Sequence, residues 1–129
     1  MSVPPKSTRE AGAEAEAAAC AFLEDRGLRI VERNFRARGG EIDLVAREGD
    51  VLVFIEVRFR EGEEFGTPEE TVGLPKRRRI VSAAREYIGR IRRDSWKEAR
   101  FDVIAVVGTG PDAVLRHYAG AFDARGKLL

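Results

Sequence analysis

The segment GGEIDLVAREGDVLVFIEVRFR, residues 39–60, carries the clearest structural pattern in this chain. Two runs rich in apolar and β-branched residues, 41–47 and 51–60, are separated by the turn-forming sequence EGD. This pattern predicts two neighbouring strands joined as a β-hairpin. Both strands carry charged side chains, and carboxylates are costly to bury unless they are paired or bind a metal. The hairpin is therefore both the centre of the predicted sheet and a candidate functional site.

Simple alternation predicts where the charged side chains of the hairpin point. Residues two apart on a strand face the same side, so Glu41 and Asp43 share one face, and Glu56 and Arg58 share another. If the strands pair across the turn, both charged faces meet on one side of the sheet. Hard divalent cations prefer carboxylate oxygens, and two such strands can hold one. The alternative is an ordinary amphipathic hairpin whose outward charges are neutralised by cross-strand pairs.

The rest of the chain predicts an α/β domain. The expected elements are a helix over 9–26, strands over 28–35, 101–107 and 113–118, and a second helix from 75 to about 93. This order favours a central mixed β-sheet flanked by helices. We expect residues 1–8 to form a flexible tail before a single domain over 9–129, and the acidic segment 61–71 to form a loop.

Length and composition restrict what this domain can be. The chain has 129 residues, enough for one core, and a formal net charge of +1, so a nucleic-acid site requires local segregation of charge. The single cysteine, Cys20, excludes an intramolecular disulfide. No apolar run reaches the roughly 18 residues of a membrane span, so we expect a cytoplasmic protein without a membrane partner. The lone histidine, His117, is more typical of a surface or packed residue than of a catalyst.

Basic residues gather in the second predicted helix. Between Lys76 and Arg93 there are eight basic residues and one acid, Glu86. Such segregation suits the binding of phosphates, although a solvated outer helix face is the alternative. The residues expected to contact a nucleic-acid backbone are Arg36, Arg38, Arg77, Arg78 and Arg79.

Longer motifs carry a resemblance to a known family. The run RNFRARGGEIDLVAREGDVLVFIEVRFR, followed by FGTPEETVGLPKRRRIVSAAREYI and RFDVIAV, resembles the YraN family of small bacterial proteins over roughly residues 12–122. That family is taken to be endonuclease-like, related in fold to Holliday-junction resolvases and restriction enzymes of the PD-(D/E)XK type. The resemblance implies a restriction-endonuclease-like fold and a Mg²⁺- or Mn²⁺-dependent nuclease acting on DNA, possible substrates being branched or damaged DNA. Because related resolvases act as dimers, it also implies a homodimer.

The resemblance assigns roles to particular residues. It implies a metal bound by Asp43 and Glu56, with Glu16 of the first predicted helix joining them. It gives Glu41, part of the GEID signature, a supporting role beside these ligands. The lysine position of the family motif is Arg58 here, where the sequence reads EVR. Arginine stays protonated and cannot act as a base, but it can orient a water or hold a phosphate oxygen.

The missing motif lysine leaves several functions open. Lys76 is a candidate replacement, on the hypothesis that its helix brings it to the same face, so the candidate catalytic residues are Asp43, Glu56, Arg58 and Lys76. The alternative is a non-catalytic nucleic-acid-binding module of the same fold. A third possibility is a partner-binding protein in DNA repair or uptake, with the acidic loop as the contact.

Overall fold

The structure is a computed structural model that describes residues 8–60 and 72–129. In chain order its elements are α1 (Thr8–Asp25), β1 (Arg29–Arg36), β2 (Glu41–Glu48), β3 (Val51–Arg60), α3 (Leu74–Arg90), a 3₁₀ turn (Arg93–Ser95), β4 (Glu98–Val107), a second 3₁₀ turn (Gly110–Asp112) and β5 (Val114–Phe122). Within the described residues the strands form one five-stranded sheet in the order β1-β2-β3-β4-β5. The β3–β4 pair is parallel and the other pairs are antiparallel. The predicted α/β fold with a mixed sheet is confirmed.

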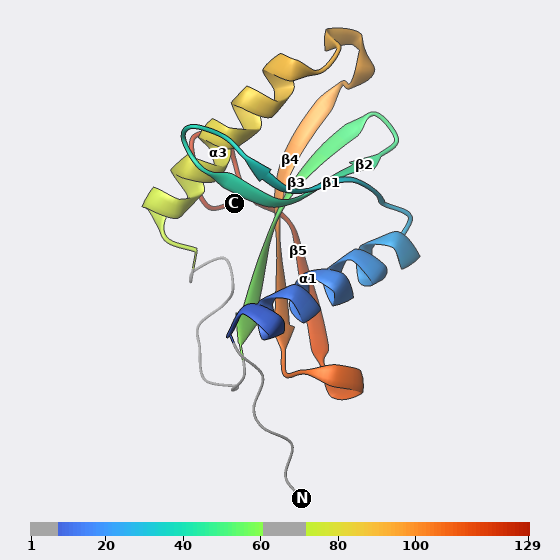
Figure 1. Ribbon diagram of the computed structural model, residues 1–129. Coiled ribbons are helices and arrows are strands. Elements are labelled where there is room, and N and C mark those ends of the chain that lie inside the picture. The colour runs from blue at the N-terminus through green and yellow to red at the C-terminus, as the bar shows by residue number, and fades with distance from the viewer. Residues whose placement is uncertain (1–7, 61–71) are drawn as a thin grey trace, which may run out of the picture.

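The two helices cover opposite faces of the sheet (Figure 1). The core under α1 is built from small and aliphatic side chains, including Ala15, Ala19, Leu23, Leu44, Val53 and Ile104. The core under α3 is rich in aromatic rings, including Phe35, Phe54, Tyr87, Phe101 and Phe122. Burying one such aliphatic or aromatic side chain contributes about 1.5–3 kcal/mol. Each sheet face therefore has its own apolar core. A charged side chain buried in the sheet is an exception that needs an explanation.

The observed elements differ from the predicted ones mainly at their ends. α3 ends at Arg90 rather than near residue 93, because Ile91 adopts an extended backbone with φ −109° and ψ 166°. β4 begins at Glu98 rather than at residue 101, since its polar first residues pair with β3 from Val51 onward. β5 continues to Phe122, beyond the expected end at residue 118. The expected acidic loop, 61–71, and all but the last residue of the expected tail lie outside the described residues.

The alternation of side chains reverses at one level of the β1–β2 pair. Ile42 packs under α3, whereas Leu44, two residues further on, packs under α1. In the register of this pair Asn34 lies opposite Asp43, and Asn34 has a left-handed backbone with φ 52°. Asparagine tolerates this conformation better than most residues. Simple alternation, which would place Glu41 and Asp43 on one face, therefore does not hold across this point.

Two glycines let the connection between β1 and β2 press onto α3. A Cβ added at Gly40 would lie 2.5 Å from the backbone oxygen of Arg79, and one at Gly39 would lie 2.2 Å from Oγ of Ser82. Because backbone atoms of a helix cannot move aside cheaply, a side chain at residue 40 does not fit. The connection consequently lies against the first half of α3, as Figure 1 shows.

Candidate active site

The candidate site lies where β2 and β3 separate. Their pairing ends at Leu44 and Ile55. Beyond that pair the backbone N–H of Val57 donates to Oδ2 of Asp43 over 2.8 Å, so a side-chain carboxylate takes the place of a strand carbonyl. A backbone N–H of a strand lies near the plane of its sheet, and this bond therefore fixes the Asp43 carboxylate in the gap between the two strands.

Glu56 lies beside Asp43, on the α3 side of the sheet. It shares that face with Phe54, and only 4% of its side chain is exposed. Burial, and after it the charge of Asp43, raise the pKa of Glu56 to about 7. Burial also raises the pKa of Asp43. Two adjoining buried carboxylates resist being ionised together, so a cation bound between them would relieve a repulsion that the fold imposes.

Two basic side chains face the Glu56 carboxylate. Nζ of Lys76, from the first turn of α3, lies 3.4 Å from Oε1 of Glu56. Nη1 of Arg58, two residues further along β3, lies 3.9 Å from the same oxygen. Nε of Arg58 is buried and has no hydrogen-bond partner in the part of the chain that the structure describes. Lys76 thus meets the geometric requirement of the replacement hypothesis, while its chemical role stays a prediction.

Glu16 approaches the carboxylate pair from the opposite layer. It projects from α1 and accepts a long hydrogen bond, 3.5 Å, from Nδ2 of Asn34. Burial, followed by the charge of Asp43, raises the pKa of Glu16. Among residues 8–60 and 72–129, however, no three His, Cys, Asp or Glu side chains are grouped closely enough to hold a metal ion. The structure therefore brings Asp43 and Glu56 together and leaves Glu16 at a greater distance.

The donor set at this site suits Mg²⁺ or Mn²⁺ in kind. Asp43 and Glu56 offer oxygen ligands, which hard divalent cations prefer, and Mg²⁺ commonly takes only one or two carboxylates together with waters and substrate phosphates. Both carboxylates have raised pKa values, which indicates that the site lacks enough compensating positive charge. Glu41 is exposed and pairs with Arg36 over 3.7 Å, so it stands beside the site rather than in it.

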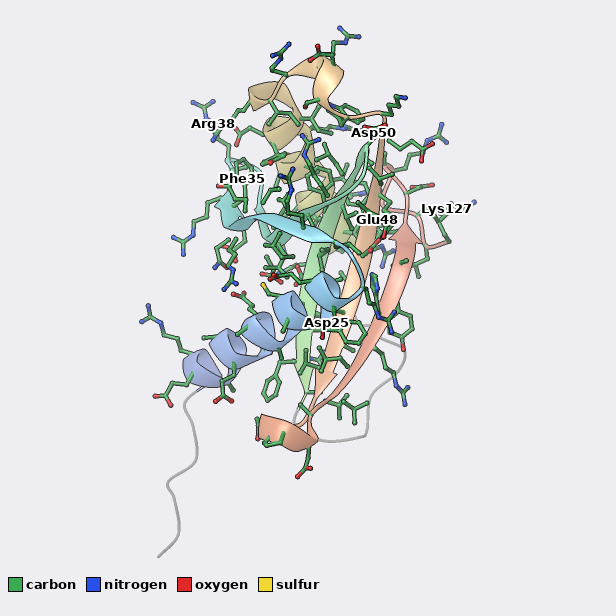
Figure 2. The ribbon with its side chains drawn as sticks, turned by 90° about the vertical axis from the view of Figure 1, so that its right-hand side faces the viewer. Asp25, Phe35, Arg38, Glu48, Asp50 and Lys127 are labelled. Carbon is green, nitrogen blue, oxygen red and sulfur yellow. The ribbon has the colours of Figure 1, made fainter. Side chains whose placement is uncertain are left out.

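A basic groove of about 430 Å³ adjoins the carboxylates. It lies between the β1–β2 connection and α3, and Arg36, Arg38 and Arg79 line it together with Lys76. Glu41 is the acid among its lining residues, and Lys76, which also contacts Glu56, connects the groove to the carboxylate pair. Figure 2 shows Arg38 at the outer edge of the connection, pointing away from the sheet.

The other two arginines predicted to bind nucleic acid lie elsewhere. Nε of Arg77 donates to the carbonyl of Gly126 over 2.6 Å, and its Nη1 donates to the carbonyl of Val72. Arg77 therefore ties the C-terminal segment to α3. Arg78 lines a separate groove on the other flank of the helix. We do not assign Arg77 to phosphate binding, because its part-buried guanidinium donates to two carbonyls, one of them over 2.6 Å.

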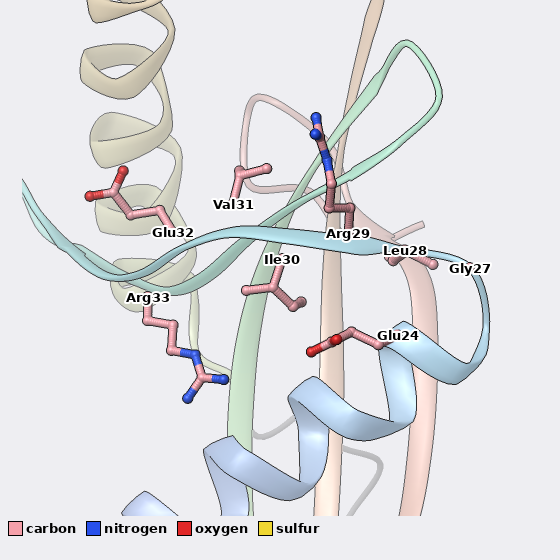
Figure 3. Close-up of a pocket in the computed structure, with 8 residues that line it drawn as sticks. All are labelled: Glu24, Gly27, Leu28, Arg29, Ile30, Val31, Glu32 and Arg33. Atoms are coloured by element: carbon pink, nitrogen blue, oxygen red, sulfur yellow. The ribbon is translucent and has the colours of Figure 1, made fainter.

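A groove of larger volume, about 570 Å³, is lined by none of these residues. It lies between the end of α1 and β1, where Ile30 and Arg33 point toward the helix and Val31 and Glu32 point away (Figure 3). Its walls carry isolated apolar side chains together with side chains of both charges. Among these lining residues, no two groups are placed to act together in a reaction. We assign the candidate chemistry to the carboxylate pair instead.

A second buried polar cluster lies on the α1 side of β4 and β5. The fully buried Asp102 accepts hydrogen bonds from Nε of Arg100 at 3.1 Å and from the backbone N–H of Gly120 at 3.0 Å. Nε2 of His117 lies 2.7 Å from its other oxygen, and Arg100 also binds Glu48 over 3.1 Å. His117 is thus a packed residue, one of the two expected alternatives. Sequence reasoning overlooked Asp102, an acid inside the apolar run RFDVIAV.

Fold and site together define a small α/β protein whose mixed sheet opens around a buried carboxylate pair beside a basic groove. The model of uncharacterised protein family UPF0102 matches residues 15–106, which include all three candidate metal ligands. A relative from Anaeromyxobacter dehalogenans is 47% identical over 117 residues, covering 90% of this chain and 86% of its own. A Chromohalobacter salexigens relative is 45% identical over 124 residues, covering 96% and 99%. Each is named UPF0102 protein. The chain belongs to this family, and the resemblance to YraN proteins is confirmed.

In the described part of the chain, neither helix is both long and apolar enough to cross a membrane.

Stability should fall as the pH rises from about 5 to 7. The pKa of Glu56 is about 7 in the folded protein against 4.5 for a free side chain, so the folded state binds its proton more tightly. Ionising Glu56 therefore costs roughly 3 kcal/mol of stability, lost between these two pKa values as the pH increases. Glu56→Gln stays neutral and should flatten this part of the pH profile. Urea unfolding of both proteins from pH 5 to 8 measures the difference, and parallel profiles would contradict the prediction.

Proposed function

We propose that the protein is a divalent-metal-dependent nuclease that hydrolyses phosphodiester bonds in DNA, with branched or damaged DNA as candidate substrates, in the cytoplasm. The observation that carries this proposal is the buried Asp43–Glu56 pair, with raised pKa values, beside a basic groove. Buried carboxylates with perturbed pKa values in contact with a specific charged partner are typical of functional sites. An ordinary amphipathic hairpin would instead leave these acids in solvent, where they cost little.

Asp43 and Glu56 would hold Mg²⁺ or Mn²⁺. Such an ion, when bound, lowers the pKa of a coordinated water and neutralises charge that develops on the phosphate. Hydrolysis joins the water oxygen to phosphorus as the bond to the leaving sugar oxygen breaks, and negative charge grows on the phosphate oxygens. The chain's own residues would supply positive charge at that point. Glu16 would add a third negative charge near the ion, because its carboxylate lies close enough to Asp43 that, after burial, the charge of Asp43 raises its pKa.

Lys76 and Arg58 would stabilise the reacting phosphate from the α3 side of the sheet. Their side chains are 39% and 26% exposed, and each approaches Oε1 of Glu56 within 4 Å. Arg58 cannot take up a proton at neutral pH, so its contribution is to orient a water or bind a phosphate oxygen. Arg36, Arg38 and Arg79 would position the backbone of the bound strand, because contacts to phosphate fix register without reading sequence.

A non-catalytic DNA-binding module is the second candidate. It is favoured by Arg58, which stands where the family motif has lysine. The homodimer implied by the resemblance also remains a prediction.

The wild-type protein should cut DNA in the presence of Mg²⁺ or Mn²⁺ and not in EDTA. We would incubate it with branched, flapped and linear DNAs, and with RNA, beside Glu56→Gln as a variant of matched shape. Loss of cutting in Glu56→Gln, with DNA binding intact, would support the nuclease. Salt-sensitive binding by the wild type without cutting in any metal would favour the binding module, and Arg58→Lys would then test whether the arginine is responsible.

A further inference from the structure

A second basic groove lies on the other flank of α3, and the proposed chemistry does not use it. Its volume is about 220 Å³. Arg78, Ser82 and Arg85 of the helix line it together with Ala124 and Arg125 of the C-terminal segment. Its described lining residues include these three arginines and no acid.

The groove has a fixed shape because the C-terminal segment is tied to α3. Arg77 donates to the carbonyl of Gly126 over 2.6 Å, and Nη2 of Arg85 donates to the carbonyl of Ala124 over 3.4 Å. Gly126 is buried, and a Cβ added there would lie 3.6 Å from Cγ of Arg78. Two arginine side chains of α3 thus donate to backbone carbonyls of the C-terminal segment and join the two walls of the groove.

The turn that carries Arg125 is itself ordered by Asp123. Oδ1 of Asp123 accepts the backbone N–H groups of Arg125 and Lys127, at 2.8 and 2.9 Å. The hydrogen bond from Lys127 lowers the pKa of the Asp123 carboxyl most, and the one from Arg125 lowers it next. Asp123 is therefore engaged by the backbone of the turn, and the Arg125 side chain remains exposed.

α3 and the β1–β2 connection separate this groove from the one at the carboxylates. Gly39 lines the first groove and lies against Ser82, which lines the second, so the two grooves meet where the connection touches α3. In the view of Figure 2, Arg38 of the connection and Lys127 of the C-terminal segment appear on opposite sides of the molecule. An α-helix with its side chains is about 10–12 Å across, which is close to the roughly 12 Å width of the major groove in B-form DNA.

We propose that Arg78, Ser82, Arg85 and Arg125 bind the phosphates of a second strand, complementary to the strand held at the carboxylates. The substrate is then double-stranded at the site, with α3 bridging the two backbones. This inference rests on the proposed function for the position of the first strand. The two grooves lie on different flanks of α3, so each backbone of a duplex can follow one of them.

Binding of a duplex and of its isolated strand, measured without divalent metal, tests this proposal. The variant is Arg85→Gln combined with Arg125→Gln. Its control is Arg29→Gln combined with Arg116→Gln, which removes the same charge from exposed residues outside both grooves. We expect the variant to bind duplex about 10- to 100-fold more weakly, to bind single strands as the wild type does, and to show a salt slope smaller by about 2.

Equal weakening of single-strand binding, an equal loss in the control, or unchanged duplex affinity would each overturn the inference. These readouts do not depend on cleavage. If duplex binding requires Arg85 and Arg125 but the protein cuts no DNA, the nuclease proposal is wrong and the role of the second groove is supported. Metal-dependent cutting, with duplex binding unchanged when both arginines are replaced, would support the nuclease proposal and overturn the role of the second groove.

Discussion

Asp43→Asn should abolish metal-dependent cleavage and leave the fold intact, whereas Asp43→Ala should lose both cleavage and stability. The two variants separate the roles of one carboxylate. The side-chain oxygen of asparagine still accepts the Val57 N–H, which Asp43 binds over 2.8 Å. It carries no charge, however, and so it no longer attracts a dication. Alanine removes the charge and the acceptor together.

The expected magnitudes follow from these separate losses. Metal-bound stabilisation of transition-state charge is worth several kcal/mol, so either variant should cut at least about 10³-fold more slowly. Leaving a buried N–H unpaired costs about 1–3 kcal/mol, and this cost should appear only in Asp43→Ala. Asp43→Asn should match or exceed the wild type in stability, because the carboxylate no longer repels Glu56.

Initial cleavage rates and urea unfolding at pH 8 measure both effects on the same preparations. Cleavage by Asp43→Asn at the wild-type rate would exclude Asp43 as a ligand. Equal instability of the two variants would show instead that the charge, and not the hydrogen bond to Val57, holds the strand gap together.

The elements of the fold were predictable because they depend on local patterns. The hairpin over residues 41–60 and the helix opened by Pro75 both have clear periodicity and turn chemistry. Their ends were less predictable, since the polar start of β4 becomes a strand only by pairing with β3. Asp43 and Glu56 of the site were also predicted, from their spacing and from the family motif.

The geometry of the site could not be predicted in the same way. The reversal of alternation at Asn34 and Asp43 depends on a left-handed residue in a strand, for which the sequence offers only an asparagine. The approach of Lys76 to Glu56 depends on how α3 crosses between two parallel strands. Arg77 looked like one of four similar basic residues until its carbonyl partners were known.

Asp102 is the clearest case of a residue whose role depends on distant partners. In the sequence it interrupts an apolar run, and alternation places it on the α1 side of β4 beside Ile104. A fully buried carboxylate there is tolerated because Arg100, His117 and the Gly120 N–H surround it. The glycine has a positive φ of 61°, and the β4–β5 register shifts at this level, which lets its N–H reach the carboxylate.

Asp102→Ala should therefore destabilise the fold by about 3–5 kcal/mol, the usual cost of removing one partner from a buried ion pair. The substitution leaves Arg100, whose side chain is 26% exposed, and His117, which is 7% exposed, without their common acceptor. A loss of this size should lower Tm by at least about 10 °C in a domain of this length. Asp102→Asn should lose less, because its oxygen still accepts a hydrogen bond.

An exposed ion pair provides the comparison for Asp102→Ala. Asp50 lies 3.6 Å from Lys97, and both side chains are more than half exposed, so Asp50→Ala should cost no more than about 1 kcal/mol. Thermal unfolding of the three variants ranks the two pairs. If Asp102→Ala were no less stable than Asp50→Ala, the cluster would contribute nothing to the fold. Because Asp102 touches neither carboxylate of the candidate site, Asp102→Ala should still cut DNA at temperatures where it remains folded, and only the temperature at which cutting stops should fall.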